Sequence, residues 1–292
     1  MQEIPHYLTR IFNAIRELED VQHSNATVVI ISLFKRKKKS KYSKDNYRGI
    51  TLQNVVGKLF ERIISNRSMP FFEKSAFPNE LQFAYQKSRS SIFASFVLQE
   101  ATLDAIKNGS KIYSCFLDSA KAFDTVWVDG LFLKLLNLDI QGKTLRLLRK
   151  WYEQMTCCVA NNGRVSAPFP VKQGVRQGGV LSPWLFMCFN NDITKEIRDT
   201  NCGIVTCSSI FCRNVNVADD VALISPRVSG LQSMILAMEH YSKKWRVTFN
   251  VSKTTTITFG ESTAANIKNK VKRLGFLITN QLKKNLLVST LV

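Results

Sequence analysis

Apolar residues recur at helical spacing in several stretches of the chain. Residues 1–20 carry them at Ile4, Leu8, Ile11, Ile15 and Leu18. Intervals of three and four residues are typical of an amphipathic helix. The same spacing runs through residues 50–72, from Leu52 to Ile64. We predict further helices over residues 91–106, 131–138, 143–154, 182–198 and 229–245.

Shorter apolar runs predict strands. Residues 26–34 (ATVVIISLF) are typical of a buried strand, and residues 111–118 (KIYSCFLD) predict a strand that finishes on Asp118. Asn162-Gly163 lies between β-like flanks, which is a strong hairpin signal. Strands are also expected on both sides of Ala218-Asp219-Asp220. Near the end of the chain we expect strands over residues 246–250, 254–259 and 273–279. Mixed strands, helices and hairpins indicate an α+β fold rather than a doubly wound parallel sheet.

The charge balance is the unusual part of the composition. The 292 residues include 41 Lys+Arg against 22 Asp+Glu, a net charge of +19. Such an excess points to a polyanionic partner, nucleic acid first and an acidic membrane surface second. The basic run at residues 34–48 (FKRKKKSKYSKDNYR) fits this partner, and it also fits a solvated loop or a nuclear-localisation signal. Without internal repeats or long linkers, a single compact unit is the default expectation.

The N-terminus mixes charges into its apolar positions and lacks the apolar core of a signal peptide. No membrane segment is predicted, because the longest apolar run near it is far too short to span a bilayer. Seven cysteines without a secretory context indicate free thiols in a reducing, intracellular compartment. Cys202, Cys207 and Cys212 recur every five residues without a neighbouring His or CxxC, so a zinc site is not favoured.

Two adjacent aspartates, Asp219 and Asp220, interrupt the β-forming stretch VNVADDVALIS. Neighbouring carboxylates repel by roughly 1 kcal/mol in water and about 4 kcal/mol at an effective dielectric constant near 20. A hairpin turn would explain the pair, because Asp tolerates turn geometry; a cation site at the turn is the alternative. Asp118, at the end of another predicted strand, would converge with them if the two strands are neighbours. Three carboxylates without His or Cys favour Mg²⁺ or Mn²⁺, and such a site suits two-metal phosphoryl transfer.

Residues 173–186 (QGVRQGGVLSPWLF) form a glycine-rich stretch that leads into a predicted helix. Glycines remove side chains where a backbone could approach a ligand closely, and Ser182-Pro183 suits the N-cap and N1 positions of the helix. A Gly-rich turn before a capped helix is the simpler explanation. Cations that suit a triphosphate or a nucleic-acid backbone lie at Lys35 to Lys39, Arg48 and Lys253.

In their order along the chain, these motifs resemble those of the reverse transcriptase domain of non-LTR (LINE-type) retrotransposons. YRGITLQNVVGKLFERII resembles the fingers motif of that family, FLDSAKAFDTV its first palm motif, GVRQGGVLSPWLF its second and VADD its third. NVSKT and RLGFLIT resemble its two closing palm motifs. Six motifs in the right order and spacing, over nearly the whole chain, make this resemblance specific.

The resemblance implies a right-hand polymerase-like fold with fingers and a palm built on an antiparallel sheet. Fingers would come from residues 1–88 and 127–170, palm from 89–126 and 171–282, and residues 283–292 would be a truncated tail. It also implies an RNA-directed DNA polymerase that adds deoxynucleotides to a primer 3′-hydroxyl. The partners would be an RNA template with a DNA primer and dNTPs, and nuclear localisation would follow from priming at chromosomal DNA. The oligomeric state is left open.

The same resemblance implies roles for the residues of the carboxylate motifs. Asp118 and Asp219, with Asp220 beside them, would bind two Mg²⁺ ions, for which Mn²⁺ could substitute. Lys253 matches a lysine that acts as general acid toward the leaving pyrophosphate.

Further residues would bind the substrate. Phe123 matches the aromatic steric gate that excludes a 2′-hydroxyl. Gln177 and Gly178 would line the pocket for the nucleotide and the template base. Arg48, with Lys37 of the basic run, would contact the triphosphate.

The chain also departs from the family pattern. Val217 replaces the usual aromatic residue before Ala218, and Gly49 stands where proline is usual. Since the sequence ends soon after RLGFLIT, we expect the thumb to be missing and processivity to be poor. The alternative is a catalytically inactive RNA-binding fragment of a retroelement. A viral RNA-dependent polymerase fits less well, because such enzymes usually carry Gly-Asp-Asp and Phe123 favours deoxynucleotides.

Overall fold

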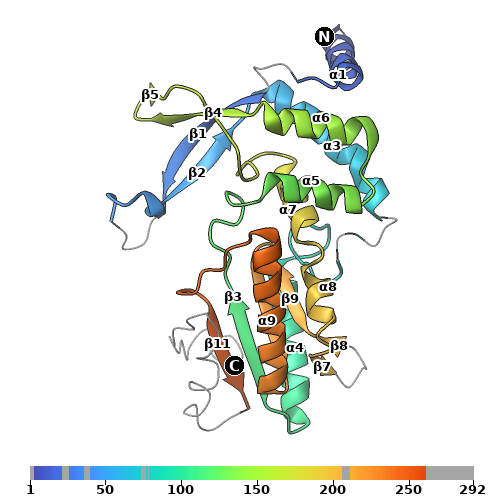
Figure 1. The fold of residues 1–292 in the computed structure, drawn as a ribbon, viewed down its shortest axis with the longest axis vertical. Helices are drawn as coiled ribbons and strands as arrows, with labels where there is room; N and C mark the ends of the chain where they lie inside the picture. The colour runs from blue at the N-terminus through green and yellow to red at the C-terminus, as the bar shows by residue number, and fades with distance from the viewer. Residues whose placement is uncertain are drawn as a thin grey trace. The chain divides into compact units, whose positions relative to one another are not determined.

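The computed structural model describes residues 3–21, 26–35, 40–73, 77, 79–205 and 211–260, without the side chains of residues 69–73. The chain divides into two compact units rather than the single one expected by default (Figure 1). One unit comprises Met1–Phe77 with Phe123–Asn190, and the other comprises Pro78–Ala122 with Asn191–Val292. Each unit is therefore assembled from two separate stretches of sequence.

The first unit combines helices with a sheet. Its described elements are α1 (Glu3–Leu18), β1 (Thr27–Phe34), the 3₁₀ turn η1 (Lys44–Asn46), β2 (Tyr47–Leu52), α3 (Val55–Glu73), α5 (Val128–Asn137), α6 (Gly142–Glu153), β4 (Thr156–Asn161), β5 (Arg164–Val165), β6 (Phe169–Pro170) and α7 (Ser182–Asn190). Four strands follow the order β2-β1-β4-β5, and β6 also pairs with β4. β1 is antiparallel to β2 and parallel to β4.

The hairpin signal in this unit is confirmed, whereas one helix boundary was wrong. Asn162 and Gly163 join β4 to β5 with φ values of 49° and 75°, and Asn-Gly is the pair that tolerates such positive angles. Residues 50–52, predicted to be helical, belong instead to β2, where Ile50 pairs with Ile31 and Leu52 with Val29. Pairing with β1 therefore decides the local conformation, and α3 begins only at Val55.

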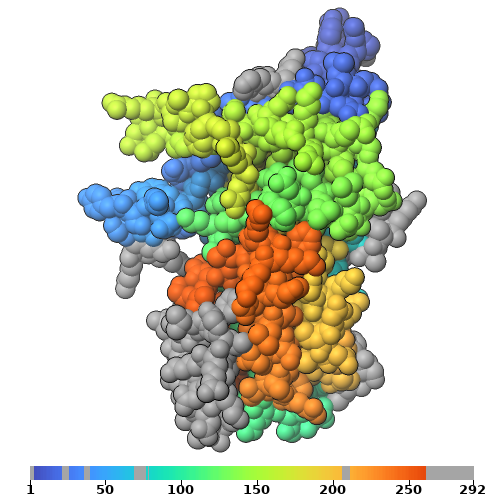
Figure 2. All heavy atoms as spheres, viewed as in Figure 1, coloured from blue at the N-terminus to red at the C-terminus, as the bar shows by residue number. Residues whose placement is uncertain are grey.

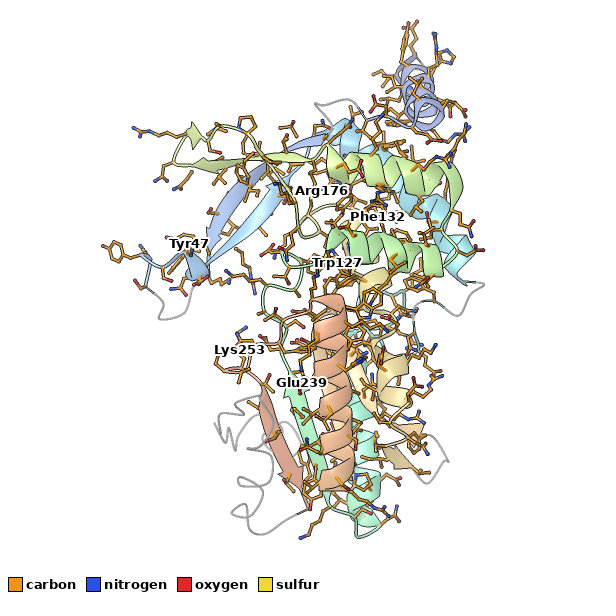
Figure 3. All side chains as sticks on the ribbon, in the orientation of Figure 1. Tyr47, Trp127, Phe132, Arg176, Glu239 and Lys253 are labelled. Atoms are coloured by element: carbon orange, nitrogen blue, oxygen red, sulfur yellow. The ribbon has the colours of Figure 1, made fainter. Side chains whose placement is uncertain are left out.

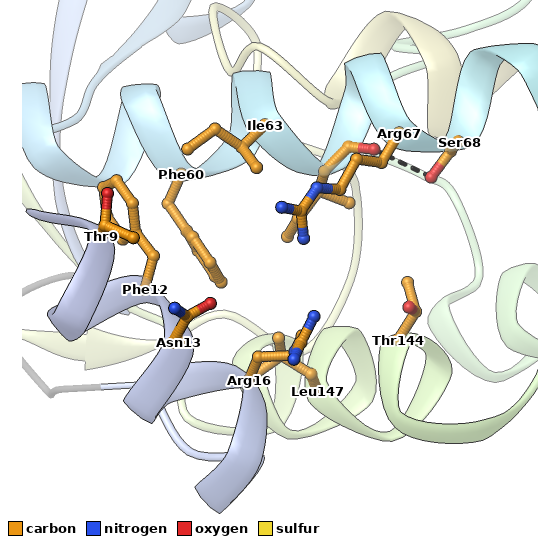
Figure 4. A pocket seen from close by; sticks show the side chains of 11 residues that line it. Thr9, Phe12, Asn13, Arg16, Phe60, Ile63, Arg67, Ser68, Thr144 and Leu147 are labelled. Carbon is orange, nitrogen blue, oxygen red and sulfur yellow. Dashed lines mark hydrogen bonds between the residues drawn. The ribbon is translucent and has the colours of Figure 1, made fainter.

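Aromatic side chains from three helices pack in the first unit. The ring centroids of Phe12 on α1 and Phe60 on α3 lie 5.1 Å apart, and Phe60 lies 5.7 Å from Trp151 on α6. Beside this cluster is a cavity of about 220 Å³ between α1, α3 and α6. Arg16 and Arg67 point into it from different helices (Figure 4).

The second unit is built on an antiparallel sheet. Its described elements are α4 (Ser91–Lys107), β3 (Ile112–Leu117), α8 (Ile193–Arg198), β7 (Ile204–Val205), β8 (Phe211–Cys212), β9 (Asn214–Val217), β10 (Asp220–Ser225), α9 (Val228–Trp245) and β11 (Thr255–Phe259). Four strands follow the order β11-β3-β10-β9, and each neighbouring pair is antiparallel. The predicted α+β class and antiparallel sheet are confirmed.

Helices pack on the sheet of the second unit and give it a core. Leu98 and Ala101 of α4 join a buried cluster with Ile112, Ala222 and Ile224 from the strands. Strand alternation turns the intervening side chains to the other face, and α9 also packs against β10 and β3. The outer side of α9, in orange, lies on the surface (Figure 2). Helices α4 and α9 thus pack on the two central strands of the sheet, β3 and β10.

Two other predictions about elements need correction. Residues 182–198 form two helices, α7 and α8, because the helical conformation is interrupted at Asn191-Asp192. Residues 246–250 do not form a strand, and only Phe249 makes a single bridge, to Ser119. The predicted strand at 273–279 lies outside the described residues, as does Cys207.

Two chemical expectations can be compared with the described part of the chain. The six cysteines there carry free thiols. Among the helices described, none combines the length and the apolar character needed to cross a membrane.

Candidate active site

The second unit brings the three aspartates of the sequence motifs to one edge of its sheet. β3 ends at Leu117, so that Asp118 follows directly, and Leu117 pairs with Val221 on the neighbouring strand β10. On the other side of β10, Asp220 pairs with Val217 of β9, which leaves Ala218 and Asp219 as a two-residue turn. The condition for convergence, that the two aspartate-bearing strands be neighbours, is therefore met.

Lys253 also belongs to this edge. Its Nζ donates hydrogen bonds to both carboxylate oxygens of Asp118, at 3.1 and 2.8 Å. The contact follows from topology, because β11 begins just after Lys253 and pairs with β3. The backbone is fixed as well, since Asn250 N–H donates to Asp118 O at 2.7 Å. Figure 3 shows Lys253 near the C-terminal end of β3.

The electrostatics of the site indicate closely spaced negative charges. The pKa of Asp220 is raised, mainly by burial and then by the charges of Asp219 and Asp118, while Lys253 opposes the shift. Burial, followed by the charge of Asp219, also raises the pKa of Tyr85. A cation bound among these carboxylates would offset both their repulsion and their loss of hydration.

A cleft of about 640 Å³ lies beside the aspartates. Asp118, Asp220 and Lys253 contribute its charged side chains, and α4, the sheet and Ser252 contribute the rest of the lining. The space is large enough for a small molecule or for part of a polymer chain.

The donor set fits a hard divalent cation by its chemistry, because it consists of carboxylates without His or Cys. Within the described residues, however, no three His, Cys, Asp or Glu side chains are gathered closely enough to hold a metal ion. In this structure the Lys253 ammonium is the cation that contacts Asp118. A metal ion would therefore have to take over the Asp118 oxygens from Lys253.

Two residues that hold the turn were not predicted from the sequence. The side chain of Gln82 hydrogen-bonds to the backbone of Ala218, and Ser119 Oγ donates to Asp219 O at 3.2 Å. Ser119 lies in the motif FLDSAKAF, directly after Asp118. Gln82 lies outside the sequence motifs of the candidate site, and the local hydrophobic pattern carries no signal for it.

The first unit contains the other described candidates. The Phe123 ring stacks on that of Phe186, with centroids 4.6 Å apart and planes 11° apart. Gln177 O accepts from Thr51 N–H at 2.7 Å, and Gln177 Nε2 donates to Asp124 Oδ1 at 3.3 Å. Arg48, on the same strand as Thr51, is exposed. Lys37 lies outside the described residues.

The glycines of this loop meet the protein's own backbone. Gly178 has φ 104°, and a Cβ there would lie 2.9 Å from Thr51 O. At Gly174 a Cβ would lie 2.7 Å from Asp124 O. Close packing on these neighbouring segments is therefore sufficient to require glycine at both positions, without a ligand.

A buried ion pair anchors the loop that carries Gln177 and Gly178. Arg176 Nη2 donates to Glu61 Oε1, and both side chains are almost fully buried. Glu61 Oε2 also accepts from Leu181 N–H at 3.0 Å. The Arg176 guanidinium lies over the Trp151 ring, 5.1 Å from its centroid. The loop is thereby tied to α3 and α6.

Residues 36–278 match the family model described as reverse transcriptase (RNA-dependent DNA polymerase). The match covers more than half of the chain, which therefore belongs to the reverse transcriptase family. Together with the similarity to curated mobile-element polymerases, this finding confirms the resemblance to non-LTR retrotransposon polymerases.

The chain is similar to curated polymerases of mobile elements. It is 28% identical to the RNA-directed DNA polymerase from mobile element jockey of Drosophila funebris, over 87% of this chain and 28% of that protein. It is 26% identical to the probable RNA-directed DNA polymerase from transposon X-element of Drosophila melanogaster, over 87% of this chain and 27% of that protein. The chain thus spans less than a third of the length of these relatives.

Solved structures of telomerase share the fold. Apo telomerase of Candida tropicalis, truncated from its C-terminal domain, superposes with a TM-score of 0.61 at 15% identity, over 90% of this chain and 56% of that one. Telomerase of Candida albicans, in complex with a TWJ fragment of telomeric RNA, gives a TM-score of 0.59 at 11% identity, over 87% and 46%. At such low identity the likeness concerns the fold alone.

Proposed function

We propose that this chain catalyses RNA-directed DNA synthesis, adding deoxynucleotides to the 3′-hydroxyl of a DNA primer on an RNA template. The observation that carries the proposal is the convergence of Asp118 with the Asp219-Asp220 turn on adjacent strands, in a chain of the reverse transcriptase family. The net charge of +19 supports a nucleic-acid partner.

Asp118, Asp219 and Asp220 would hold two Mg²⁺ ions, with Mn²⁺ as a substitute. When bound, such ions lower the pKa of the attacking hydroxyl and stabilise the charge on the leaving group. The raised pKa of Asp220 supports this assignment, because burial, and after it the charges of Asp219 and Asp118, disfavour the ionised carboxylate, and a bound cation would offset both effects.

Lys253 is assigned to the leaving pyrophosphate. Its side chain is 61% exposed and its Nζ is already beside Asp118. A flexible lysine stem at this position can move its ammonium from Asp118 to a phosphate oxygen and donate a proton there.

The remaining assignments concern substrate selection, and we assign them to the first unit. Phe123 would exclude the 2′-hydroxyl of a ribonucleotide, and its stacking on buried Phe186 would stiffen the ring for that purpose. Gln177 and Gly178 would contact the nucleotide and the template base. Arg48 and Lys37 would bind the triphosphate.

The proposed division into fingers and palm differs from the two compact units at three segments. Residues 78–88, which the resemblance assigns to the fingers, group with the second unit. Residues 123–126 and 171–190, which it assigns to the palm, group with the first unit. We retain the assignment of fingers to 1–88 and 127–170 as a proposal.

Primer extension by the purified chain tests the proposed activity. The reaction contains an RNA template with an annealed DNA primer, dNTPs and Mg²⁺, and runs beside an Asp219→Asn/Asp220→Asn variant. An Asp129→Asn/Asp199→Asn variant makes the same charge change at two exposed positions and serves as the control. We expect extension by the wild type and the control, and none by the Asp219/Asp220 variant. Replacing dNTPs by rNTPs should abolish extension, and a Phe123→Ala variant should restore part of it.

The second candidate function is RNA binding without catalysis. The observation that favours it is the Lys253–Asp118 ion pair, which neutralises one proposed metal ligand. This function would be supported if the folded wild type binds RNA but extends no primer with Mg²⁺ or Mn²⁺. Salt-sensitive RNA binding by itself agrees with both functions.

A further inference from the structure

A short segment before α4 runs alongside the strand that leads into the aspartate turn. Asn216 N–H donates to Leu81 O at 2.9 Å, and Phe83 N–H donates to Asn216 O at 2.8 Å. These bonds place Gln82 opposite Asn216 in a parallel bridge. Gln82 is therefore fixed by its backbone next to the hairpin, and only 7% of the residue is exposed.

The side-chain amide of Gln82 holds the peptide groups on both sides of Ala218. Its Oε1 accepts from Ala218 N–H at 2.9 Å, and its Nε2 donates to Ala218 O at 3.3 Å. Among side chains of this length, a primary amide offers both a donor and an acceptor without a charge. Oε1 also accepts from Ala84 N–H at 3.0 Å. This hydrogen bond within the segment of Gln82 helps to fix the orientation of the side-chain amide.

Ala218 requires such support because its backbone is strained. Its φ of 57° lies in the left-handed region, which costs a residue with a Cβ roughly 1 kcal/mol. Since Ala218 directly precedes Asp219, relaxation of this angle would swing the Asp219 carboxylate away from the sheet edge. Ser119 holds the following carbonyl, that of Asp219, at 3.2 Å. Side-chain hydrogen bonds thus hold the turn at two successive residues, Ala218 and Asp219.

We propose that Gln82 is a positioning residue for nucleotidyl transfer. It maintains the left-handed conformation of Ala218 and so keeps the Asp219 carboxylate oriented to share a divalent cation with Asp118. Gln82 acts through the backbone of Ala218 and has no direct part in the chemistry. The inference rests on the proposed polymerase function, and it adds a specific requirement for cation binding.

The first measurement is the affinity of the full chain for Mn²⁺, which is monitored by electron paramagnetic resonance. Gln82→Met keeps the length of the side chain and removes both hydrogen bonds. Substitutions that disturb the support of a metal ligand typically weaken metal binding by about 10- to 100-fold, so we expect a weaker Mn²⁺ affinity in that range. Gln82→Glu retains the acceptor for Ala218 N–H and should bind Mn²⁺ more tightly than Gln82→Met. Gln232→Met makes the same change on α9 and should behave as wild type.

Primer extension supplies the second measurement. We expect Gln82→Met to need more Mg²⁺ for half-maximal rate and to lose about 10-fold or more in kcat. The KM for dNTP at saturating Mg²⁺ should stay unchanged, because no nucleotide contact is removed. A melting temperature close to that of Gln232→Met would show that the effect is local.

The outcomes separate the two proposals. If the wild type extends primers and Gln82→Met shows wild-type Mn²⁺ affinity and Mg²⁺ dependence, the role of Gln82 is overturned while the polymerase stands. If Gln82→Met loses its cooperative melting, Gln82→Glu decides the matter: the role is overturned if this variant melts normally but binds Mn²⁺ about 10-fold or more weakly than the wild type, because the acceptor for Ala218 N–H is still present. If the wild type extends nothing, yet binds Mn²⁺ in a Gln82-dependent way, the polymerase function fails and the positioning role is supported.

Discussion

Arg176 and Glu61 form an ion pair inside the first unit, although 115 residues separate them in the sequence. The side chain of Glu61 is 0% exposed and that of Arg176 is 4% exposed. A buried ion pair of this kind adds little net stability over an apolar pair of similar volume. Removing one partner, however, leaves the other charge buried and uncompensated. Its location makes the pair the link between α3 and the loop of Gln177.

We expect Glu61→Leu to destabilise the protein by about 3–5 kcal/mol, because Arg176 would remain buried and charged. The Leu181 N–H would lose its acceptor too. The double variant Glu61→Leu/Arg176→Met should recover most of the loss, since neither charge remains. Urea unfolding of the three proteins measures these free energies.

An exposed pair provides the comparison for that prediction. On α9, Lys243 Nζ lies 2.7 Å from Glu239 Oε1, and the Lys243 side chain is exposed. Lys243→Ala should cost less than about 1 kcal/mol. Equal losses for Glu61→Leu and Lys243→Ala would show that burial of the first pair carries no energetic consequence.

Gly178 should be more sensitive to alanine than another glycine of positive φ. Both Gly178 and Gly163 have positive φ, so alanine strains either backbone by roughly 1 kcal/mol. At Gly178 the new Cβ would also lie 2.9 Å from Thr51 O, whereas at Gly163 nothing lies within 4 Å. Gly178→Ala should therefore lower the midpoint of urea unfolding further than Gly163→Ala, and equal midpoints would contradict the close approach.

Local patterns predicted those parts of the fold that local interactions determine. The helical spacing of residues 91–106 predicted α4, and Asn162-Gly163 predicted the β4–β5 turn. Residues 50–52 were misassigned because apolar residues suit either a helix or a strand. Their pairing with β1 decided the conformation, and this partner is not local in sequence.

In the candidate site, too, some residues could be predicted from the local sequence and others depend on contacts between distant segments. Asp118, Asp219 and Asp220 could be found because carboxylates at strand ends are conspicuous in a sequence. Gln82 could not, since its role depends on a contact with Ala218, 136 residues away. Glu61 did carry a signal: it shares the buried face of α3 with Phe60 and Ile64, and a charge on an apolar face calls for a partner. The partner, Arg176, could only be identified from the structure.

Thiol reactivity should follow burial among the described cysteines. Burial raises the pKa of Cys115 to about 12 and that of Cys212 to about 11. The thiolate is the reactive form, and a raised pKa moves its appearance to higher pH. At pH 8 iodoacetamide should therefore modify partly exposed Cys158 and Cys202 well before Cys115 or Cys212. Peptide mapping of the native protein measures the order, and early labelling of Cys115 would contradict its burial.

Lys253 should affect metal binding and catalysis in opposite directions. Its Nζ donates to both oxygens of Asp118, so it competes with any cation for that carboxylate. Lys253→Met removes the competitor, and Mn²⁺ should bind more tightly, by about 1 kcal/mol or more, since hydrogen bonds between charged groups contribute on that order.

The same variant also lacks the ammonium that we assign to the leaving pyrophosphate. Its primer-extension rate at saturating Mg²⁺ should therefore fall, by about 10²-fold if Lys253 acts as general acid. Lys253→Arg keeps the charge but donates a proton poorly, because its pKa is higher. It should thus retain wild-type Mn²⁺ affinity and still extend primers slowly. A Lys253→Met variant that binds Mn²⁺ tightly and extends at the wild-type rate would limit Lys253 to the ion pair with Asp118.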